Sequence, residues 1–182
     1  MATSQDVRLE CRLLFTPDDL THYLYALFHC SKYKKNFHHI PMDLLKILEK
    51  TDYKLSLQNF WQLVNYGREI KSLYFIEKKT LEQNANYFPV FRNPIVTQIK
   101  VIHRGTKKAT GVDVCINKMQ FYKNVSEEGW AFCLDSYSPA QRWLENKTGK
   151  NVTTMDVAIF KKNISFSTEM SRLTKKINAI TI

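Results

Sequence analysis

The sequence of 182 residues contains little glycine and little proline, five of each. This scarcity, together with 44% hydrophobic residues, excludes a collagen-like chain and a disordered low-complexity chain. No run of about 18 apolar residues occurs, so the sequence predicts no transmembrane helix. The first residues lack the basic-then-apolar pattern of a secretion signal, so we expect an intracellular location, cytoplasmic or nuclear.

Recognisable metal and phosphate motifs are also missing. The four cysteines form no CxxC pair, which is typical of reduced core residues in an intracellular protein. A zinc site built from His29, Cys30, His38 and His39 is disfavoured because their spacing fits no closed tetrahedral site. Neither GxxxxGK[ST] nor GxGxxG occurs, so no phosphate-binding loop of these types is expected.

Positive charge is what the chain has in excess. Lysine and arginine number 27 against 17 acidic residues, which gives a formal net charge of +10 and a pI near 9.4. Such a balance favours a polyanionic partner, most often nucleic acid. The alternative is a solvated charged face, or a basic subunit within an assembly. The expected nucleic-acid contacts lie in basic clusters interleaved with aromatic residues: Lys34, Lys35, Arg104, Lys107, Lys108 and Lys118.

Hydrophobic periodicity predicts a succession of strands and helices. Strands are expected at 7–15, 68–78, 95–103, 129–136 and 151–160. Helices are expected at 16–30, 41–50, 56–66, 112–124, 138–150 and 165–180, although the β-branched start at residue 112 leaves that helix ambiguous. The alternation predicts one α/β domain over 1–182, with three layers: a mostly parallel sheet of about five strands with helices on both faces.

Four acids lie near the predicted strand ends or at the start of the following helix: Asp18, Asp19, Asp113 and Asp135. If their carboxylates converge, they could hold Mg²⁺ or Mn²⁺ and generate a water nucleophile for phosphodiester cleavage. The alternative is structural. Asp18 and Asp19 would then complement the positive end of a helix capped by Thr16, and Asp135 would open the next helix.

Several segments resemble the NYN domain, a PIN-like nuclease family. The resemblance rests on NYGREIKSLYFI, IVTQIKVIHRGTKKATGVDV and GWAFCLDSYSPAQRWLENKTGKNV, and it is clearest over 55–182. It implies a PIN-like fold and metal-dependent ribonuclease chemistry. Asp113 falls on the acid of the family's GVD segment, and Asp135 falls on the first acid of its SGDSD motif.

The chain departs from that family at positions that a nuclease needs. Tyr137 stands where the second acid of the motif is expected, and Leu134 replaces its glycine. We therefore expect a degenerate site, without a cofactor, in a module that binds RNA or another nucleic acid or contacts a protein partner. The alternatives are an active ribonuclease with Mg²⁺ or Mn²⁺ at Asp113, Asp135 and Asp18 or Asp19, or a basic structural subunit of a viral or ribonucleoprotein assembly.

Overall fold

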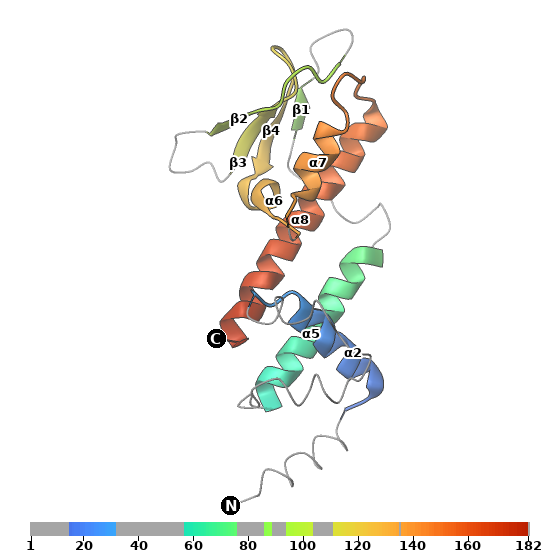
Figure 1. The fold of residues 1–182 in the computed structure, drawn as a ribbon, viewed down its shortest axis with the longest axis vertical. Helices are drawn as coiled ribbons and strands as arrows, with labels where there is room; N and C mark the ends of the chain where they lie inside the picture. Colours follow the sequence, from blue (N-terminus) through green and yellow to red (C-terminus); the bar gives the residue numbers. More distant parts are fainter. Residues whose placement is uncertain are drawn as a thin grey trace, which may run out of the picture. The chain divides into compact units, whose positions relative to one another are not determined.

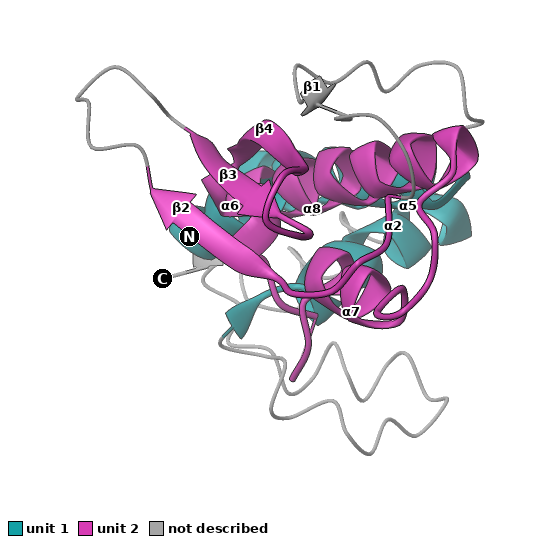
Figure 2. Cartoon of the chain, turned by 90° about the horizontal axis from the view of Figure 1, so that it is seen from above, with its two compact units in different colours: residues 1–75, 173–182 teal, residues 76–172 magenta. Residues whose placement is uncertain are grey.

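The structure is a computed structural model that describes residues 15–31, 57–75, 86–88, 94–103, 111–134 and 136–181. The chain forms two compact units, coloured separately in Figure 2. Unit 1 comprises residues 1–75 and 173–182, and unit 2 comprises residues 76–172. Within the described ranges, no helix combines the length and the apolarity that crossing a bilayer requires.

Unit 1 contains helices α2 (Pro17–Phe28) and α5 (Leu57–Phe75), together with the last part of α8 (Thr154–Thr181). Leucine, valine and isoleucine recur on α5 at helical spacing and are buried, as at Leu63 and Ile70. The ring of Tyr23 on α2 lies 5.0 Å from the ring of Phe60 on α5. Apolar and aromatic contacts of this kind hold α2 and α5 together.

The backbones of α2 and α5 meet at Gly67. A Cβ atom at this position would lie 1.7 Å from the carbonyl oxygen of His22, so only glycine allows the observed approach. Gly67 is therefore an interhelical contact in the middle of α5. The sequence predicted that the helix over 56–66 would end near this glycine, but α5 continues past it to Phe75.

Unit 2 is built around a four-stranded sheet in the order β1-β4-β3-β2. The strands are β1 (Asn86–Phe88), β2 (Lys100–His103), β3 (Gly111–Cys115) and β4 (Phe121–Ser126), and every pairing is antiparallel. Figure 1 shows these strands at one end of unit 2 beside α7 and the first part of α8. The predicted mostly parallel five-stranded sheet is therefore wrong.

The core of unit 2 lies between one face of the sheet and its helices. α6 (Glu127–Ala131) and α7 (Pro139–Glu145) accompany the N-terminal part of α8. Phe160 of α8 is fully buried and stacks on Tyr122 of β4, with ring centroids 4.0 Å apart. The rings of Trp130 and Trp143 pack against the Phe160 ring, with ring centroids 6.3 and 5.9 Å away. The described helices thus cover one face of the sheet, whereas the sequence predicted helices on both.

The predicted helix over 112–124 is instead the β3–β4 hairpin. Val112, Val114 and Ile116 alternate toward the core, a two-residue period that a strand satisfies and a helix does not. Asn117 forms the turn, because its side-chain Oδ1 accepts hydrogen bonds from the backbone N–H groups of Met119 and Gln120 at 2.9 and 2.8 Å. In this hairpin the connection between β3 and β4 is short, and the two strands pair in antiparallel orientation.

Three predicted strands overlap helices: two are largely helical, and the one at 129–136 is helical only as far as Ala131. Residues 68–78 continue α5 as far as Phe75, residues 129–136 begin inside α6, and residues 151–160 include the first turns of α8. In the last case Asp156 and Phe160 are both buried at a spacing of four, which is the period of a helix face. The expected helices at 16–30 and 165–180 are confirmed by α2 and α8, and the helix expected at 138–150 is confirmed in part, by α7. The expected strand at 95–103 is confirmed in part, by β2. The helix expected at 41–50 lies outside the described residues, as does nearly all of the strand expected at 7–15.

Candidate nucleic-acid interface

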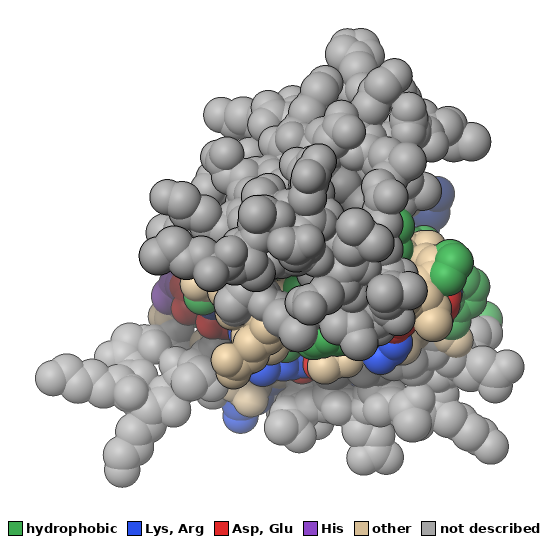
Figure 3. All heavy atoms as spheres, turned by 90° about the horizontal axis from the view of Figure 1, so that it is seen from below, with side chains coloured by type: hydrophobic (Ala, Val, Ile, Leu, Met, Phe, Trp, Pro, Cys, Tyr) green, Lys and Arg blue, Asp and Glu red, His purple; other side chains and the backbone are tan. Residues whose placement is uncertain are grey.

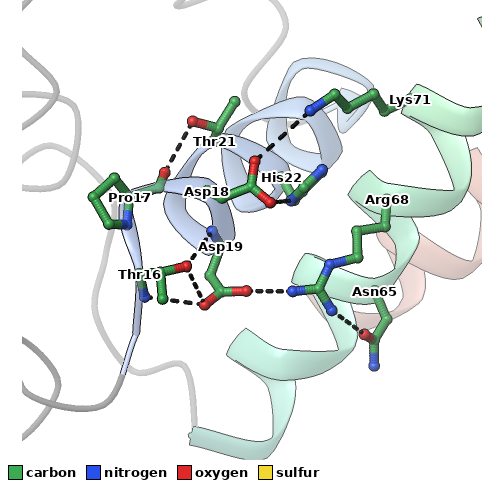
Figure 4. A network of polar contacts seen from close by, with 9 residues as sticks. All are labelled: Thr16, Pro17, Asp18, Asp19, Thr21, His22, Asn65, Arg68 and Lys71. Atoms are coloured by element: carbon green, nitrogen blue, oxygen red, sulfur yellow. Dashed lines mark hydrogen bonds and ion pairs between the residues drawn. The ribbon is translucent and has the colours of Figure 1, made fainter.

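The two acids of the first turn of α2 have structural partners, which Figure 4 shows. Thr16 and Asp19 form a capping box: Asp19 N–H donates to Thr16 Oγ1 at 3.2 Å, and Thr16 N–H donates to Asp19 Oδ2 at 3.0 Å. The other carboxylate oxygen of Asp19 pairs with Arg68 of α5. Hydrogen bonds from Thr16, assisted by the charge of Arg68, hold the pKa of Asp19 below its usual value of 3.8. The interpretation of Asp19 as a helix-start residue is confirmed.

Asp18 faces a neighbouring set of side chains in the same network. Its carboxylate lies 3.7 Å from Lys71 Nζ and 3.4 Å from Nδ1 of the buried His22, the latter without hydrogen-bond geometry. Asp18 and Asp19 belong to unit 1, whereas Asp113 belongs to unit 2. Within the described residues, no group of three or more His, Cys, Asp or Glu side chains could hold a metal ion.

Asp113 supports an irregularity of the sheet. The register of β3 against β4 shifts between Val112 and Val114, so that Lys123 and Asn124 together oppose Asp113. Asn124 has a φ of 55°, and its N–H donates to Asp113 Oδ1 at 3.0 Å. A β-bulge leaves a backbone N–H without its ladder partner, and the Asp113 carboxylate supplies the acceptor.

The chemical setting of Asp113 also affects its neighbour on β3. Burial raises the pKa of the Cys115 thiol, and the negative charge of Asp113 raises it further. Asp135 lies outside the described residues. A metal-binding role for Asp113 and Asp135 stays a prediction.

Of the six basic residues expected to contact nucleic acid, Lys118 lies within the described structure. The others lie outside it: Lys34, Lys35, Arg104, Lys107 and Lys108. Lys118 is exposed in the β3–β4 turn, between Asn117 and Met119.

Three segments meet around this turn and form what we call the turn end of unit 2: residues 94–98, 116–120 and 146–153. The N–H groups of Thr97 and Gln98 donate to the carbonyl of Ile116 at 2.9 and 3.2 Å. The side chain of Asn117 donates to the carbonyl of Ile95 at 3.1 Å. Residues 94–98 are thereby fixed against the β3–β4 turn.

Residues 94–98 also hold the connection between α7 and α8 in place. Gly149 N–H donates to the carbonyl of Val96 at 2.8 Å, and Val96 N–H donates to the carbonyl of Lys150 at 3.2 Å. Gly149 adopts a φ of 75°, which glycine tolerates and which reverses the chain at this point. Figure 1 shows the two turns at the same end of unit 2. Hydrogen bonds therefore make one surface from three segments that are distant in sequence.

The turn end carries positive charge without acidic residues. It contains Lys118, Lys147 and Lys150, and the three segments include no Asp or Glu. Lys118 and Lys150 are exposed, and among the described residues neither pairs with a carboxylate. Exposed hydrogen-bonding side chains surround these lysines: Thr97, Gln98, Asn146, Thr148 and Asn151. Lysine and neutral polar side chains are the groups that bind phosphate oxygens.

Lys147 has a different role, because it anchors the turn. Its Nζ lies 2.6 Å from Asp156 Oδ1, and both side chains are largely buried. Thr153 donates its N–H and its hydroxyl to Asp156 Oδ2, each at 2.9 Å. Burial alone would raise the pKa of Asp156, but the hydrogen bonds from Lys147 and Thr153 outweigh it and lower that pKa. Asp156 thus ties the start of α8 to the α7–α8 connection.

In Figure 3, described Lys and Arg side chains appear beside Asp and Glu side chains on the face that is shown. The described residues of that face therefore display mixed charge. Sequence reasoning missed Lys150 and the residues around it, although the lysines and the glycine of NKTGKN were a signal for a basic turn.

Fold and site together define a module with an antiparallel sheet, helices on one of its faces and a lysine-bearing turn end. The chain belongs to the family of Type ISP C-terminal specificity domains, whose model matches residues 8–176. The NYN resemblance is therefore wrong, and with it the PIN-like interpretation and the family argument for an acidic site. The coarse functional prediction, a module that binds nucleic acid, agrees with this family.

Individual relatives are distant. The chain is 25% identical over 139 residues to tubulin monoglycylase TTLL3 of Danio rerio, covering 72% of this chain and 18% of that protein. Two solved structures are similar to it: the ATP-dependent Type ISP restriction-modification enzyme LlaBIII bound to DNA, and a nuclease-deletion mutant of the Type ISP enzyme LlaGI in complex with a DNA substrate mimic. Their identities are 16% and 17% and their TM-scores 0.49 and 0.47. The two matches cover 96% and 91% of this chain, which corresponds to 12% and 14% of the length of the two enzymes.

Proposed function

We propose that this chain is a specificity module that binds double-stranded DNA, with the turn end contacting the sugar-phosphate backbone. The observation that carries the proposal is the match of a specificity-domain family over residues 8–176. DNA is chosen over RNA because the family is named for Type ISP enzymes, and the two such enzymes described above are bound to DNA or to a DNA substrate mimic.

The charge of the turn end supports a phosphate contact. Lys118 and Lys150 are exposed on neighbouring turns and can approach an anion without first breaking an ion pair. Each phosphate that a lysine neutralises releases condensed counterions, which makes binding stronger at low salt. The N-terminus of α8 contributes less, because the Asp156 carboxylate already occupies it through the Thr153 cap.

The test is the salt dependence of DNA binding, measured by fluorescence anisotropy on a labelled duplex. We expect Lys118→Gln/Lys150→Gln to weaken binding to all duplex sequences alike. It should also reduce the slope of log K against log salt by about 1.8, since each phosphate contact contributes about 0.9. The matched control is Lys71→Gln/Lys176→Gln, which removes the same charge from unit 1 and should leave the slope unchanged.

Three results would contradict the proposal. Equal slopes for the wild type and the turn-end variant would exclude the turn end as the phosphate contact. Equal losses in both double variants would mean that net charge, and not this surface, determines affinity. Tighter binding to a matched RNA duplex than to DNA would exclude a DNA specificity module.

A further inference from the structure

We propose that α7 is the element that reads the DNA sequence, and that Arg142 is its principal base-contacting residue. This inference rests on the proposed function, since it assigns a specificity-determining residue within that DNA-binding module. It concerns the helix that leads directly into the turn end.

One face of α7 is buried and the other is open. Ala140 and Leu144 are fully buried in the core of unit 2, whereas Arg142 and Glu145 are exposed. Asn146, the residue that ends the helix, is also exposed. Positions 142, 145 and 146 are spaced i, i+3 and i+4, so their side chains share the open face.

The chemical types on this face suit base edges better than phosphates. Arginine pairs with guanine O6 and N7, glutamate accepts from cytosine N4, and asparagine pairs with adenine. A carboxylate such as that of Glu145 is repelled by phosphate oxygens, so a surface devoted to the backbone would not carry it. The acid-free turn end and the α7 positions Arg142 and Glu145 therefore divide the two tasks, positioning and reading, and Asn146 lies where the two surfaces join.

Arg142 is already held in place. Its guanidinium carbon lies 4.8 Å from the centroid of the ring of Tyr137, a residue that is itself 40% exposed. Although Glu145 is three residues away, the two side chains form no ion pair, and Arg142 stacks on the tyrosine instead. A planar guanidinium stacked on a ring keeps its N–H edge available for a bidentate acceptor and loses little freedom on binding.

The support beneath this pair is rigid. Ser138 Oγ and Gln141 Nε2 both donate to the carbonyl of Trp130 at 2.9 Å, which fixes the start of α7 against α6. Leu134 and Tyr137 exchange backbone hydrogen bonds at 2.9 and 3.2 Å, which fixes the tyrosine backbone. A helix of this length extends about 10 Å and fits a major groove about 12 Å wide.

The experiment is selection of preferred duplexes from a randomised pool by the full chain, followed by sequencing. We expect the wild type to select a site containing at least one G·C pair. Arg142→Ala should lose discrimination at that pair by about tenfold or more, while binding to unrelated duplexes changes little. Tyr137→Phe should keep the preference, and Tyr137→Ala should weaken it because the guanidinium loses its platform. Lys150→Gln is the matched control, since it should weaken all duplexes alike and leave the selected site unchanged.

Each other outcome overturns the inference. If Arg142→Ala weakens every duplex alike, the residue contacts phosphate. If the variant selects the wild-type site with undiminished preference, α7 does not read the sequence. If the wild-type chain binds no duplex even at about 50 mM salt, the proposed function itself fails. Circular dichroism and the fluorescence of Trp130 and Trp143 establish that each variant is folded.

Discussion

The anchor of the turn end gives the most quantitative test of the structure. Asp156→Ala removes the acceptor for both Thr153 donors and the partner of Lys147. Loss of a helix cap costs about 1 kcal/mol. Loss of a charged hydrogen bond from the largely buried Lys147 costs about 2 kcal/mol. We therefore expect the free energy of unfolding of unit 2 to fall by about 3 kcal/mol.

Urea unfolding can be followed in unit 2 alone. Trp130 and Trp143 belong to the core of unit 2, and Trp61 lies in unit 1. In a Trp61→Phe background, fluorescence therefore reports the unfolding of unit 2. The slope of the free energy against urea should not change, because the surface exposed on unfolding stays nearly the same.

Two comparisons separate the cap from the ion pair. Thr153→Ala removes only the cap hydroxyl and should cost about 1 kcal/mol. Glu169→Ala removes a half-exposed i,i+3 partner of Arg172 on α8 and should cost less than about 0.5 kcal/mol. If Asp156→Ala costs no more than Thr153→Ala, the Lys147 pair contributes nothing to stability and the reasoning is refuted.

Two further outcomes follow from the carboxylates. The folded-state pKa values of Asp19 and Asp156 lie below the ordinary value of 3.8, so their stabilisation is fully present above about pH 4 and is lost as pH falls through the lowered values. Urea midpoints that stay constant between about pH 6 and about pH 2 would contradict this. Asp113→Ala should destabilise unit 2 by about 1 kcal/mol, because the bulge N–H of Asn124 loses its acceptor, whereas Asp113→Asn keeps an acceptor oxygen and should cost less than half as much. Equal urea midpoints for the two variants would show that the acceptor at this position does not matter.

Local signals in the sequence predicted the elements that local interactions form. Thr16 followed by Pro17 and two acids is a helix start, and the structure has the complete capping box there. The helix expected from residue 138 likewise begins there, with Ser138 as the N-cap of α7 and Pro139 in its first turn. These predictions needed no knowledge of tertiary packing, and they are confirmed.

Predictions that depended on packing failed. Residues 68–78 look like a strand because of their isoleucine and aromatic residues, but Ile70 and Leu73 continue the buried face of α5. Residues 112–124 look ambiguous, and the deciding information lies in the pairing of β3 with β4 and in the bulge at Asn124. β propensity depends on neighbouring strands, which a single segment does not reveal.

The turn end shows the same limit for the candidate site. Lys118 was predicted from its own surroundings, but Lys150 becomes part of the same surface only because Val96 bonds the backbone at Gly149 and Lys150. Net charge behaves differently, since it is a sum over residues and does not depend on how the chain folds. An excess of ten positive charges therefore predicted a module that binds a polyanion, which agrees with the family, although the fold assigned to that module was wrong. The position of a charge on the surface, and therefore the proposed distinction between a lysine that positions DNA and an arginine that reads it, requires the three-dimensional structure.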